Sequence, residues 1–318
     1  MSGRGEEVPL VRSILVPLDG SAFAEQALPW AACLARATGA RLELVRVHDP
    51  VPAWTLPMEG AVVLSASDPE IRATEEQYLA NCVARLEEGR FAHTTWTLLE
   101  GEVAEVIARH AEHQSVDLVV AATHGRGALS RIWLGSVSDA LVRRLTEPLL
   151  LIRPTEAATV PCSGPFRSAL VALDGSTAAE SALAAALELC PPEGAEFVLV
   201  RVVSPVVLPT DATLPAAPAV DESLTERLAT QARLYLEEVA ARLRARGARV
   251  STRVIVEPGV AAAVLHEAVR GQVGLIAVAT HGERGMRRLV LGSVADKILR
   301  GADRPVLLTR VPEERGKG

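Results

Sequence analysis

Two stretches of this chain carry residues whose types and spacing could bind an anion. Residues 123–136 read THGRGALSRIWLGS and residues 280–293 read THGERGMRRLVLGS, so a Thr-His-Gly start and a Gly-Ser end recur at the same spacing. Glycines let backbone amides turn toward a ligand without a Cβ in the way, and a helix that begins at the final serine adds partial positive charge. Such a helix terminus contributes only about 0.3–1 kcal/mol per charge at an exposed site. Several amides and an arginine would have to act together, which favours a phosphate chain as the ligand.

A plainer interpretation of these loops is structural: the glycines make a long turn and the serine caps a helix. We favour ligand binding because both copies keep the same frame while the residues between have diverged. Neither loop is a P-loop, since the G-x-x-x-x-G-K-[ST] pattern is absent, and no G-x-G-x-x-G fingerprint follows the first expected strand.

Each loop follows an expected strand in a repeated series of strands and helices. In the first half the hydrophobic pattern predicts strands over 13–18, 41–48, 94–99, 117–123 and 148–153, and helices over 22–38, 69–89, 102–114 and from 136. In the second half it predicts strands over 168–173, 196–203, 249–256, 274–280 and 305–310, and helices over 177–189, 221–246, 260–270 and 293–301. This alternation predicts a doubly wound α/β fold, with a parallel sheet and helices on both faces. Ligands of such sheets bind outside the carboxyl ends of the strands.

The chain is a tandem duplication of one domain of about 150 residues. ILVPLD at 14–19 matches ALVALD at 169–174, and both continue Gly-Ser. We expect the first domain over 1–153, a linker with three prolines over 154–166, and the second domain over 167–318.

The composition is globular, with 49% hydrophobic and 23% charged residues, and the net charge of −6 argues against general nucleic-acid binding. No uncharged apolar run is long enough to span a membrane, and the start MSGRGEEVPLVR has no hydrophobic signal region, so we expect a cytoplasmic protein. The four cysteines lie far apart and the seven histidines show no ligand spacing, so we expect neither a disulfide framework nor a metal site.

With these motifs the chain resembles the universal stress protein family, in a tandem two-domain form. The ATP-binding branch of that family has a G-x2-G-x9-G-[ST] loop, and this sequence has Ala122-x2-Gly125-x9-Gly135-Ser136 and Ala279-x2-Gly282-x9-Gly292-Ser293. PLDGS at 17–21 and the LVRV of the second strand in each half also match. The resemblance implies five parallel strands in the order 3-2-1-4-5 in each domain. The first glycine of the motif is alanine in both copies, which is tolerable where φ is negative and the residue does not touch the ligand.

The resemblance also assigns binding residues by position. Asp19 and Asp174 would approach the adenosine, Val47 and Val202 would meet the adenine edge through their backbones, and the loops would hold the phosphates. The implied cofactor is ATP, ADP or AMP, with Mg²⁺ as an optional companion. The full set of expected binding residues is Pro17, Asp19, Val47, Ala122, Gly125, Arg126, Gly135, Ser136, Val137, Asp174, Val202, Ala279, Gly282, Gly292, Ser293 and Val294.

The two copies differ in ways that predict unequal affinity. Arg126 follows the second motif glycine in the first copy, where the second copy has Glu283. A carboxylate near a triphosphate weakens binding by like-charge repulsion. The first copy also keeps Pro17 and Ser138, where the second has alanine. We therefore expect the first site to bind nucleotide more tightly.

No residue pattern indicates an efficient catalyst. His124 and His281 are interpreted as loop-structuring side chains, and no nucleophile motif such as G-x-S-x-G is present. We expect no catalytic residues and at most slow ATP hydrolysis. The leading hypothesis is a nucleotide-binding stress-response or signalling protein, and the alternative is a nucleotide-free interaction scaffold of the same fold. A weaker third hypothesis, an enzyme of the adenine-nucleotide α-hydrolase-like group, would need an S-G-G-x-D-S loop that LDGSAF does not supply.

Two further expectations concern assembly and loops. We expect the halves to pack as an intrachain pseudo-dimer through their fifth strands, with a homodimer of the whole chain as a further option. The proline-rich segments 50–68 and 204–220 follow the second strand of each half. They are interpreted either as lids that order on nucleotide binding or as insertions without that role.

Overall fold

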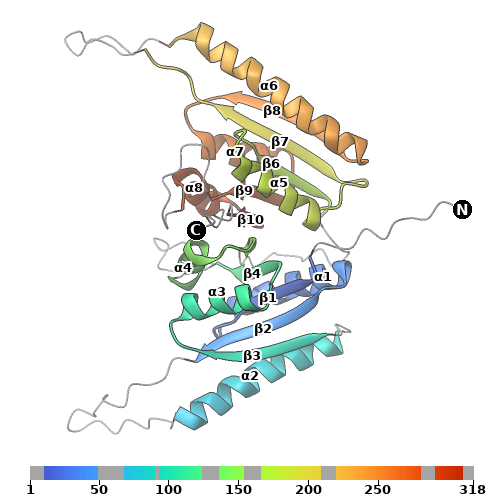
Figure 1. The fold of residues 1–318 in the computed structure, drawn as a ribbon, viewed down its shortest axis with the longest axis vertical. Coiled ribbons are helices and arrows are strands. Elements are labelled where there is room, and N and C mark those ends of the chain that lie inside the picture. Colours follow the sequence, from blue (N-terminus) through green and yellow to red (C-terminus); the bar gives the residue numbers. More distant parts are fainter. Residues whose placement is uncertain are drawn as a thin grey trace, which may run out of the picture. The chain divides into compact units, whose positions relative to one another are not determined.

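The chain forms two compact units, Met1–Gly164 and Pro165–Gly318, each with its own sheet and its own helices (Figure 1). The structure is a computed structural model, and it describes residues 11–48, 68–89, 93–123, 136–153, 166–208, 220–280 and 291–310. The expected linker at 154–166 falls almost wholly outside these residues.

The first unit has five parallel strands in the order β3-β2-β1-β4-β5. The strands are β1 (Ser13–Pro17), β2 (Arg41–His48), β3 (Thr94–Glu100), β4 (Leu118–Ala122) and β5 (Leu149–Ile152). The helices are the short 3₁₀ helix η1 (Ala24–Ala27), α1 (Leu28–Thr38), α2 (Asp68–Glu88), α3 (Val103–His113) and α4 (Ser136–Arg144).

The second unit repeats this arrangement, with parallel strands in the order β8-β7-β6-β9-β10. Its strands are β6 (Ser168–Ala172), β7 (Glu196–Val203), β8 (Arg249–Val256), β9 (Leu275–Ala279) and β10 (Val306–Thr309). Its helices are α5 (Thr177–Leu189), α6 (Glu222–Ala245), α7 (Val260–Arg270) and α8 (Ser293–Gly301). The predicted α/β fold and the strand order 3-2-1-4-5 in each unit are confirmed.

The central strands are buried on both faces, which explains their apolar sequences. All four residues of β5 are buried, as are the first four of β4. Right-handed crossovers place the helices that follow β1 and β2 on one face and those that follow β3 and β4 on the other. A strand covered on both sides loses the alternation of apolar and polar residues and becomes a continuous apolar run.

The first predicted helix, 22–38, is divided in the structure into η1 and α1. Pro29 lies in the first turn of α1. Proline has no backbone N–H to donate and disfavours helical backbone at the residue before it, so it is best placed where a helix starts. Gly39 ends α1 in the left-handed conformation, with φ +72°, and acts as the predicted C-cap.

The order of the strands brings distant segments to one edge of each sheet. In the first unit β1 lies between β2 and β4, so the chain leaves β1 and β4 in opposite directions. This is the switch point at which doubly wound sheets bind ligands. Asp19 follows β1 and Thr123 follows β4, and in the second unit Asp174 and Thr280 take these places.

Among the described helices, none has the length and apolar character needed to cross a membrane.

Candidate functional site at the switch points

Both units present an aspartate in a tight turn just after their first strand. The Leu18 amide donates to the Val45 carbonyl at 2.8 Å, which continues the β1–β2 pairing to the residue before Asp19. One carboxylate oxygen of Asp19 then accepts from the Ser21 amide at 2.8 Å. Asp19 is exposed, and no described residue donates to its second oxygen. The carboxylate is therefore held at the sheet edge with acceptor capacity to spare.

The second unit builds the same turn. The Leu173 amide donates to the Val200 carbonyl at 2.8 Å. Asp174 accepts from both the amide and the hydroxyl of Ser176, at 3.0 and 2.6 Å. The Ser176 hydroxyl oxygen in turn accepts from the Ala179 amide at 3.1 Å and caps α5.

The glycine of each turn has a backbone that only glycine adopts easily. Gly20 has φ +88° and Gly175 has φ +92°. A Cβ on Gly20 would overlap the guanidinium of Arg46, and a Cβ on Gly175 would lie 3.2 Å from Nη1 of Arg201. The backbone conformation thus favours glycine in both turns, and at Gly20 a Cβ would also require the neighbouring arginine to shift.

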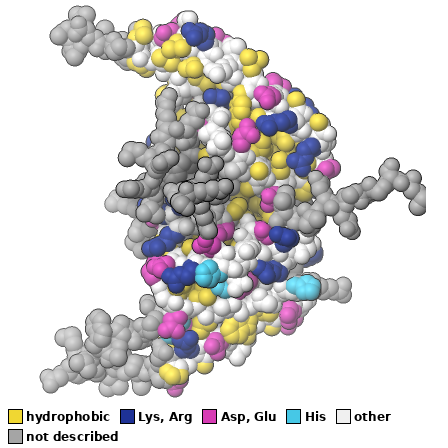
Figure 2. Space-filling view, viewed as in Figure 1, with side chains coloured by type: hydrophobic (Ala, Val, Ile, Leu, Met, Phe, Trp, Pro, Cys, Tyr) yellow, Lys and Arg dark blue, Asp and Glu magenta, His cyan; other side chains and the backbone are white. Residues whose placement is uncertain are grey.

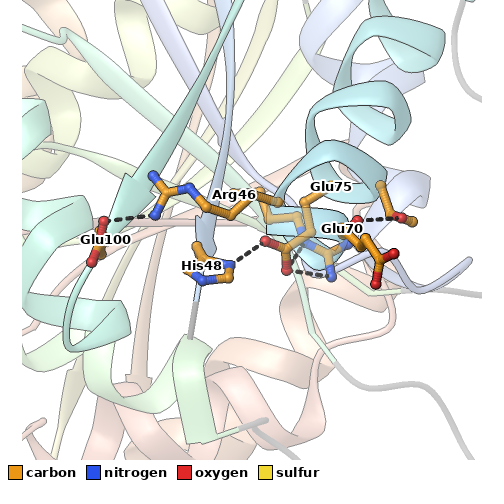
Figure 3. A network of polar contacts seen from close by, with 7 residues as sticks. Arg46, His48, Glu70, Glu75 and Glu100 are labelled. Atoms are coloured by element: carbon orange, nitrogen blue, oxygen red, sulfur yellow. Dashed lines mark hydrogen bonds and ion pairs between the residues drawn. The ribbon is translucent and has the colours of Figure 1, made fainter. Parts of the chain in front are cut away.

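Arg46 belongs to a charged cluster that has no counterpart in the described part of the second unit. Its Nε donates to Oε1 of Glu75 on α2 at 3.1 Å, and its guanidinium lies over the ring of Tyr78, 5.4 Å from the ring centre. Nδ1 of His48 lies 2.7 Å from Oε2 of Glu75 (Figure 3). His48 is 0% exposed and the Glu75 side chain is 10% exposed. Hydrogen bonds to a carboxylate this well buried are strong, and removing the carboxylate leaves its partners with a large desolvation penalty.

The second unit keeps the arginine and the tyrosine but not the acid and the histidine. Arg201 lies over the ring of Tyr235, also 5.4 Å from the ring centre. Ala232 stands three residues before Tyr235, as Glu75 stands three residues before Tyr78, and Val203 ends β7 where His48 ends β2. The Tyr235 hydroxyl donates to Glu180 at 3.2 Å, and its burial raises the pKa of Tyr235 to about 12. The arginine–tyrosine pair is therefore the part common to both units.

The two motif alanines are compatible with their positions. Ala122 is the last residue of β4 and Ala279 the last of β9, and neither is among the described residues with positive φ. The Ala122 carbonyl accepts from the Ser138 hydroxyl at 3.2 Å, which ties the end of β4 to α4. An alanine in place of the first glycine of the motif thus causes no backbone strain here.

Helix α8 starts without a side-chain cap. Gly292 is its N-cap, and the Gly292 amide donates to the Thr280 carbonyl at 2.9 Å. Ser293 is exposed and forms the first residue of the helix rather than its cap. An uncapped helix start directs backbone amides and partial positive charge toward the space in front of it.

The remaining predicted residues divide into two groups. Pro17 ends β1, Val47 and Val202 are half-buried near the ends of β2 and β7, Val137 lies in the first turn of α4, and Val294 is exposed on α8. Gly125, Arg126, Gly135 and Gly282 lie outside the described residues, as do His124, His281, Glu283 and the side chain of Ser136.

Segment 204–220 is described only at its two ends, which lie together. Val207 and Val220 form an isolated antiparallel bridge. The Asp221 amide donates to the Val206 carbonyl at 2.8 Å, and Asp221 caps α6 by accepting from the Leu224 amide. The base of this segment is thus fixed to the start of α6; its role as a lid stays a prediction.

Positive and negative side chains alternate over the described surface that faces the viewer in Figure 2. Some of the described charged residues form pairs one helical turn apart, such as Asp139 with Arg143 on α4 and Asp296 with Arg300 on α8. Asp139 and Asp296 lie in the first turns of their helices, where a negative charge also interacts favourably with the helix dipole.

Within the described ranges no group of three or more His, Cys, Asp or Glu side chains could hold a metal ion.

Replacing Gly20 with alanine should show how closely Arg46 approaches the turn. Gly39 is the control, since it also has positive φ but a Cβ there would meet nothing within 4 Å. Both changes should cost about 1–2 kcal/mol of backbone strain, and Gly20→Ala should cost at least about 1 kcal/mol more by displacing Arg46. All four tryptophans lie in the first unit, so urea unfolding followed by tryptophan fluorescence reports on that unit. Equal losses for the two variants would contradict the close approach.

These features define a class of protein: a pair of doubly wound α/β domains, each with a polar turn and a helix start at its switch point. The profile of the universal stress protein family matches residues 11–153 and again residues 165–310. The chain therefore belongs to the universal stress protein family, with two such domains in tandem.

Proteins similar to this chain carry the same family name. A universal stress protein of Mycolicibacterium smegmatis is 28% identical over 312 residues, which cover 93% of this chain and 96% of that protein. One from Mycobacterium tuberculosis is 33% identical over 196 residues, and the match spans only 61% of this chain and 62% of that relative. The crystal structure of a universal stress protein from Archaeoglobus fulgidus superimposes with a TM-score of 0.67 at 17% identity, covering 94% of this chain and 96% of that one. At that identity the likeness concerns the fold.

Proposed function

We propose that this chain is a nucleotide-binding stress-response or signalling protein that holds an adenine nucleotide at the carboxyl edge of each sheet. The observation that carries the proposal is the repeated Asp-Gly turn at the switch point, with Asp19 and Asp174 in the same place in both units. Switch points are where doubly wound sheets bind ligands, and a fixed carboxylate there can accept hydrogen bonds from ribose hydroxyls.

The starts of the helices after β4 and β9 support a phosphate site beside these turns. Helix α8 begins without a side-chain acceptor, which suits an anionic group. Ala122 and Ala279 fit the motif without strain, so the described part of each loop is compatible with the ATP-binding pattern. Because no cluster of metal ligands lies within the described residues, Mg²⁺ enters this proposal only as a companion of the nucleotide phosphates.

A universal stress protein that aligns with 46% of this chain, at 19% identity and a TM-score of 0.36, was crystallised in complex with cAMP. At that level of similarity the ligand of this chain has to be tested directly.

A ligand-dependent stability measurement tests the proposal. ATP, ADP or AMP at a hundred times its dissociation constant should add about 2.7 kcal/mol to the stability of the unit that binds it. Tryptophan fluorescence follows the first unit alone, and far-ultraviolet circular dichroism follows both. No change with any of the three nucleotides at millimolar concentration would contradict nucleotide binding and favour the interaction scaffold.

The two sites should differ in affinity, with the first site the tighter because Arg126 stands where the second copy has Glu283. Ser136→Ala should therefore lower the apparent affinity for a non-hydrolysable ATP analogue more than Ser293→Ala, by several-fold in a titration of the full chain. A harmless Ser136→Ala together with a damaging Ser293→Ala would reverse the assignment.

A further inference from the structure

Both units hold an arginine between an aromatic ring and the turn that carries the switch-point aspartate. Arg46 lies over Tyr78 and against Gly20, and Arg201 lies over Tyr235 and against Gly175. The arginine precedes the valine expected to meet the adenine, and the tyrosine comes from the helix that follows the same strand. This arrangement recurs although the helices α2 and α6 otherwise differ in sequence.

An ion pair does not explain why the arginine is retained in both units. Arg46 is paired with Glu75, but in the described part of the second unit no carboxylate pairs with Arg201, and Ala232 stands where Glu75 would be. What the two units share is the contact of the guanidinium with the ring and with the glycine turn. A planar guanidinium stacked on an aromatic ring is a rigid group and fixes whatever backbone packs against it.

The backbone that packs against it is the turn that orients the aspartate. Gly20 directly follows Asp19, and Gly175 directly follows Asp174. A Cβ on Gly20 would overlap the Arg46 guanidinium, so the arginine lies directly beside the turn and limits its movement on that side. On the other side, the Leu18–Val45 hydrogen bond holds the turn to β2. The direction of the Asp19 carboxylate is therefore limited by the arginine from one side and by the sheet from the other.

We propose that Arg46 and Arg201 are positioning residues that hold the Asp-Gly turns in place, so that Asp19 and Asp174 can read the ribose hydroxyls of a bound nucleotide. This inference rests on the proposed nucleotide-binding function and adds to it a determinant of sugar specificity. The arginines act through the aspartates, since their guanidinium groups are engaged by the ring and the turn.

The test compares ribose with deoxyribose nucleotides in the full chain. Titrations of wild type, Arg46→Met and Arg201→Met with ATP, 2′-deoxy-ATP and 3′-deoxy-ATP give the preference for ribose. Wild type should prefer ATP over at least one deoxy analogue by tenfold or more. In the arginine variant of a unit that binds nucleotide, affinity for ATP should fall about tenfold while affinity for that analogue changes less than twofold, which removes the preference.

Glu75→Gln is the matched control that separates the ion pair of Arg46 from its contact with the turn. It removes the acidic partner of Arg46 but leaves the arginine, the tyrosine ring and the turn in place. The preference for ribose should survive in Glu75→Gln, whereas an arginine that mattered only as an ion-pair partner would make Glu75→Gln resemble Arg46→Met. Arg201→Met covers the case in which Arg46→Met fails to fold, because among the described residues no acid pairs with Arg201 and would be left without its partner.

The outcomes separate this inference from the function on which it rests. If wild type binds none of the three nucleotides, the proposed function is wrong. If wild type binds ATP but shows no preference for ribose, or if both arginine variants keep the preference, nucleotide binding stands and the positioning role is overturned.

Discussion

Glu75→Ala is expected to destabilise the first unit by about 3 kcal/mol, because it leaves a buried histidine and an arginine without their shared acceptor. His48 is 0% exposed and lies 2.7 Å from one Glu75 oxygen, while Arg46 donates to the other at 3.1 Å. Removing one member of a buried charged cluster costs more than the cluster contributes, since the remaining members keep their desolvation penalty. Urea unfolding followed by tryptophan fluorescence would measure the loss in this unit alone.

The second unit shows which apolar residues can take the places of Glu75 and His48. It packs Ala232 and Val203, which are 0% and 8% exposed, where the first unit has Glu75 and His48. Adding His48→Val to Glu75→Ala should therefore recover most of the lost stability, because well-packed apolar residues can replace a buried ion pair at little cost.

An exposed helix acid provides the baseline for this comparison. Glu105→Ala on α3 removes a carboxylate that pairs with Arg109 at the surface of the same unit, with a side chain 49% exposed, and should cost less than about 0.5 kcal/mol. A loss on Glu75→Ala no larger than on Glu105→Ala would show that the cluster is not a buried network. A double variant less stable than Glu75→Ala would show that the two units do not pack these positions alike.

Asp19→Asn should weaken nucleotide binding at the first site by roughly 10- to 150-fold, the equivalent of a charge-assisted hydrogen bond worth about 1.5–3 kcal/mol. Asparagine retains an oxygen that can accept from the Ser21 amide, so the turn itself should persist. The expected effect is on affinity, measured by titration of the full chain with ATP, and not on unfolding. Asp174→Asn makes the same test at the second site.

Asp117→Asn is the matched control at the opposite edge of the first sheet. Asp117 immediately precedes β4 and accepts from the amides of Arg12 and Ser13 at 2.8 and 3.0 Å. The same loss of charge there should leave nucleotide affinity unchanged. Equal affinity losses for Asp19→Asn and Asp117→Asn would mean that net charge, rather than contact with the ligand, sets the affinity.

Much of the fold could be predicted from local patterns. The continuous apolar runs of β4 and β5 indicate strands covered on both faces, and the C-cap at Gly39 is visible as a glycine after an amphipathic stretch. The repeat of ILVPLD at 169–174 established two similar halves. The strand order did not follow from periodicity; it came from the resemblance to a family, and the structure confirms it.

The polar cluster beside the turn could not be predicted in this way. Arg46 and Glu75 are 29 residues apart in the sequence, and each is an ordinary charged residue on its own element. The sequence signal for this cluster is that Tyr78 recurs as Tyr235 in the second unit. The signal can be interpreted only once the structure shows an arginine guanidinium over each ring. The start of α8 could not be predicted from the sequence either. The Gly292 amide donates to the Thr280 carbonyl, and the N-cap is Gly292 rather than Ser293.

The sequence by itself determined the tandem α/β domains, the family and the aspartates expected at the binding edge, because strand and helix periodicity, glycine frames and repeats are properties of short segments. Only the tertiary structure decided which side chains surround those aspartates. Contacts between a strand and the helix packed on it depend on side-chain direction and on the twist of the sheet, and neither is fixed by the spacing of residues along the chain.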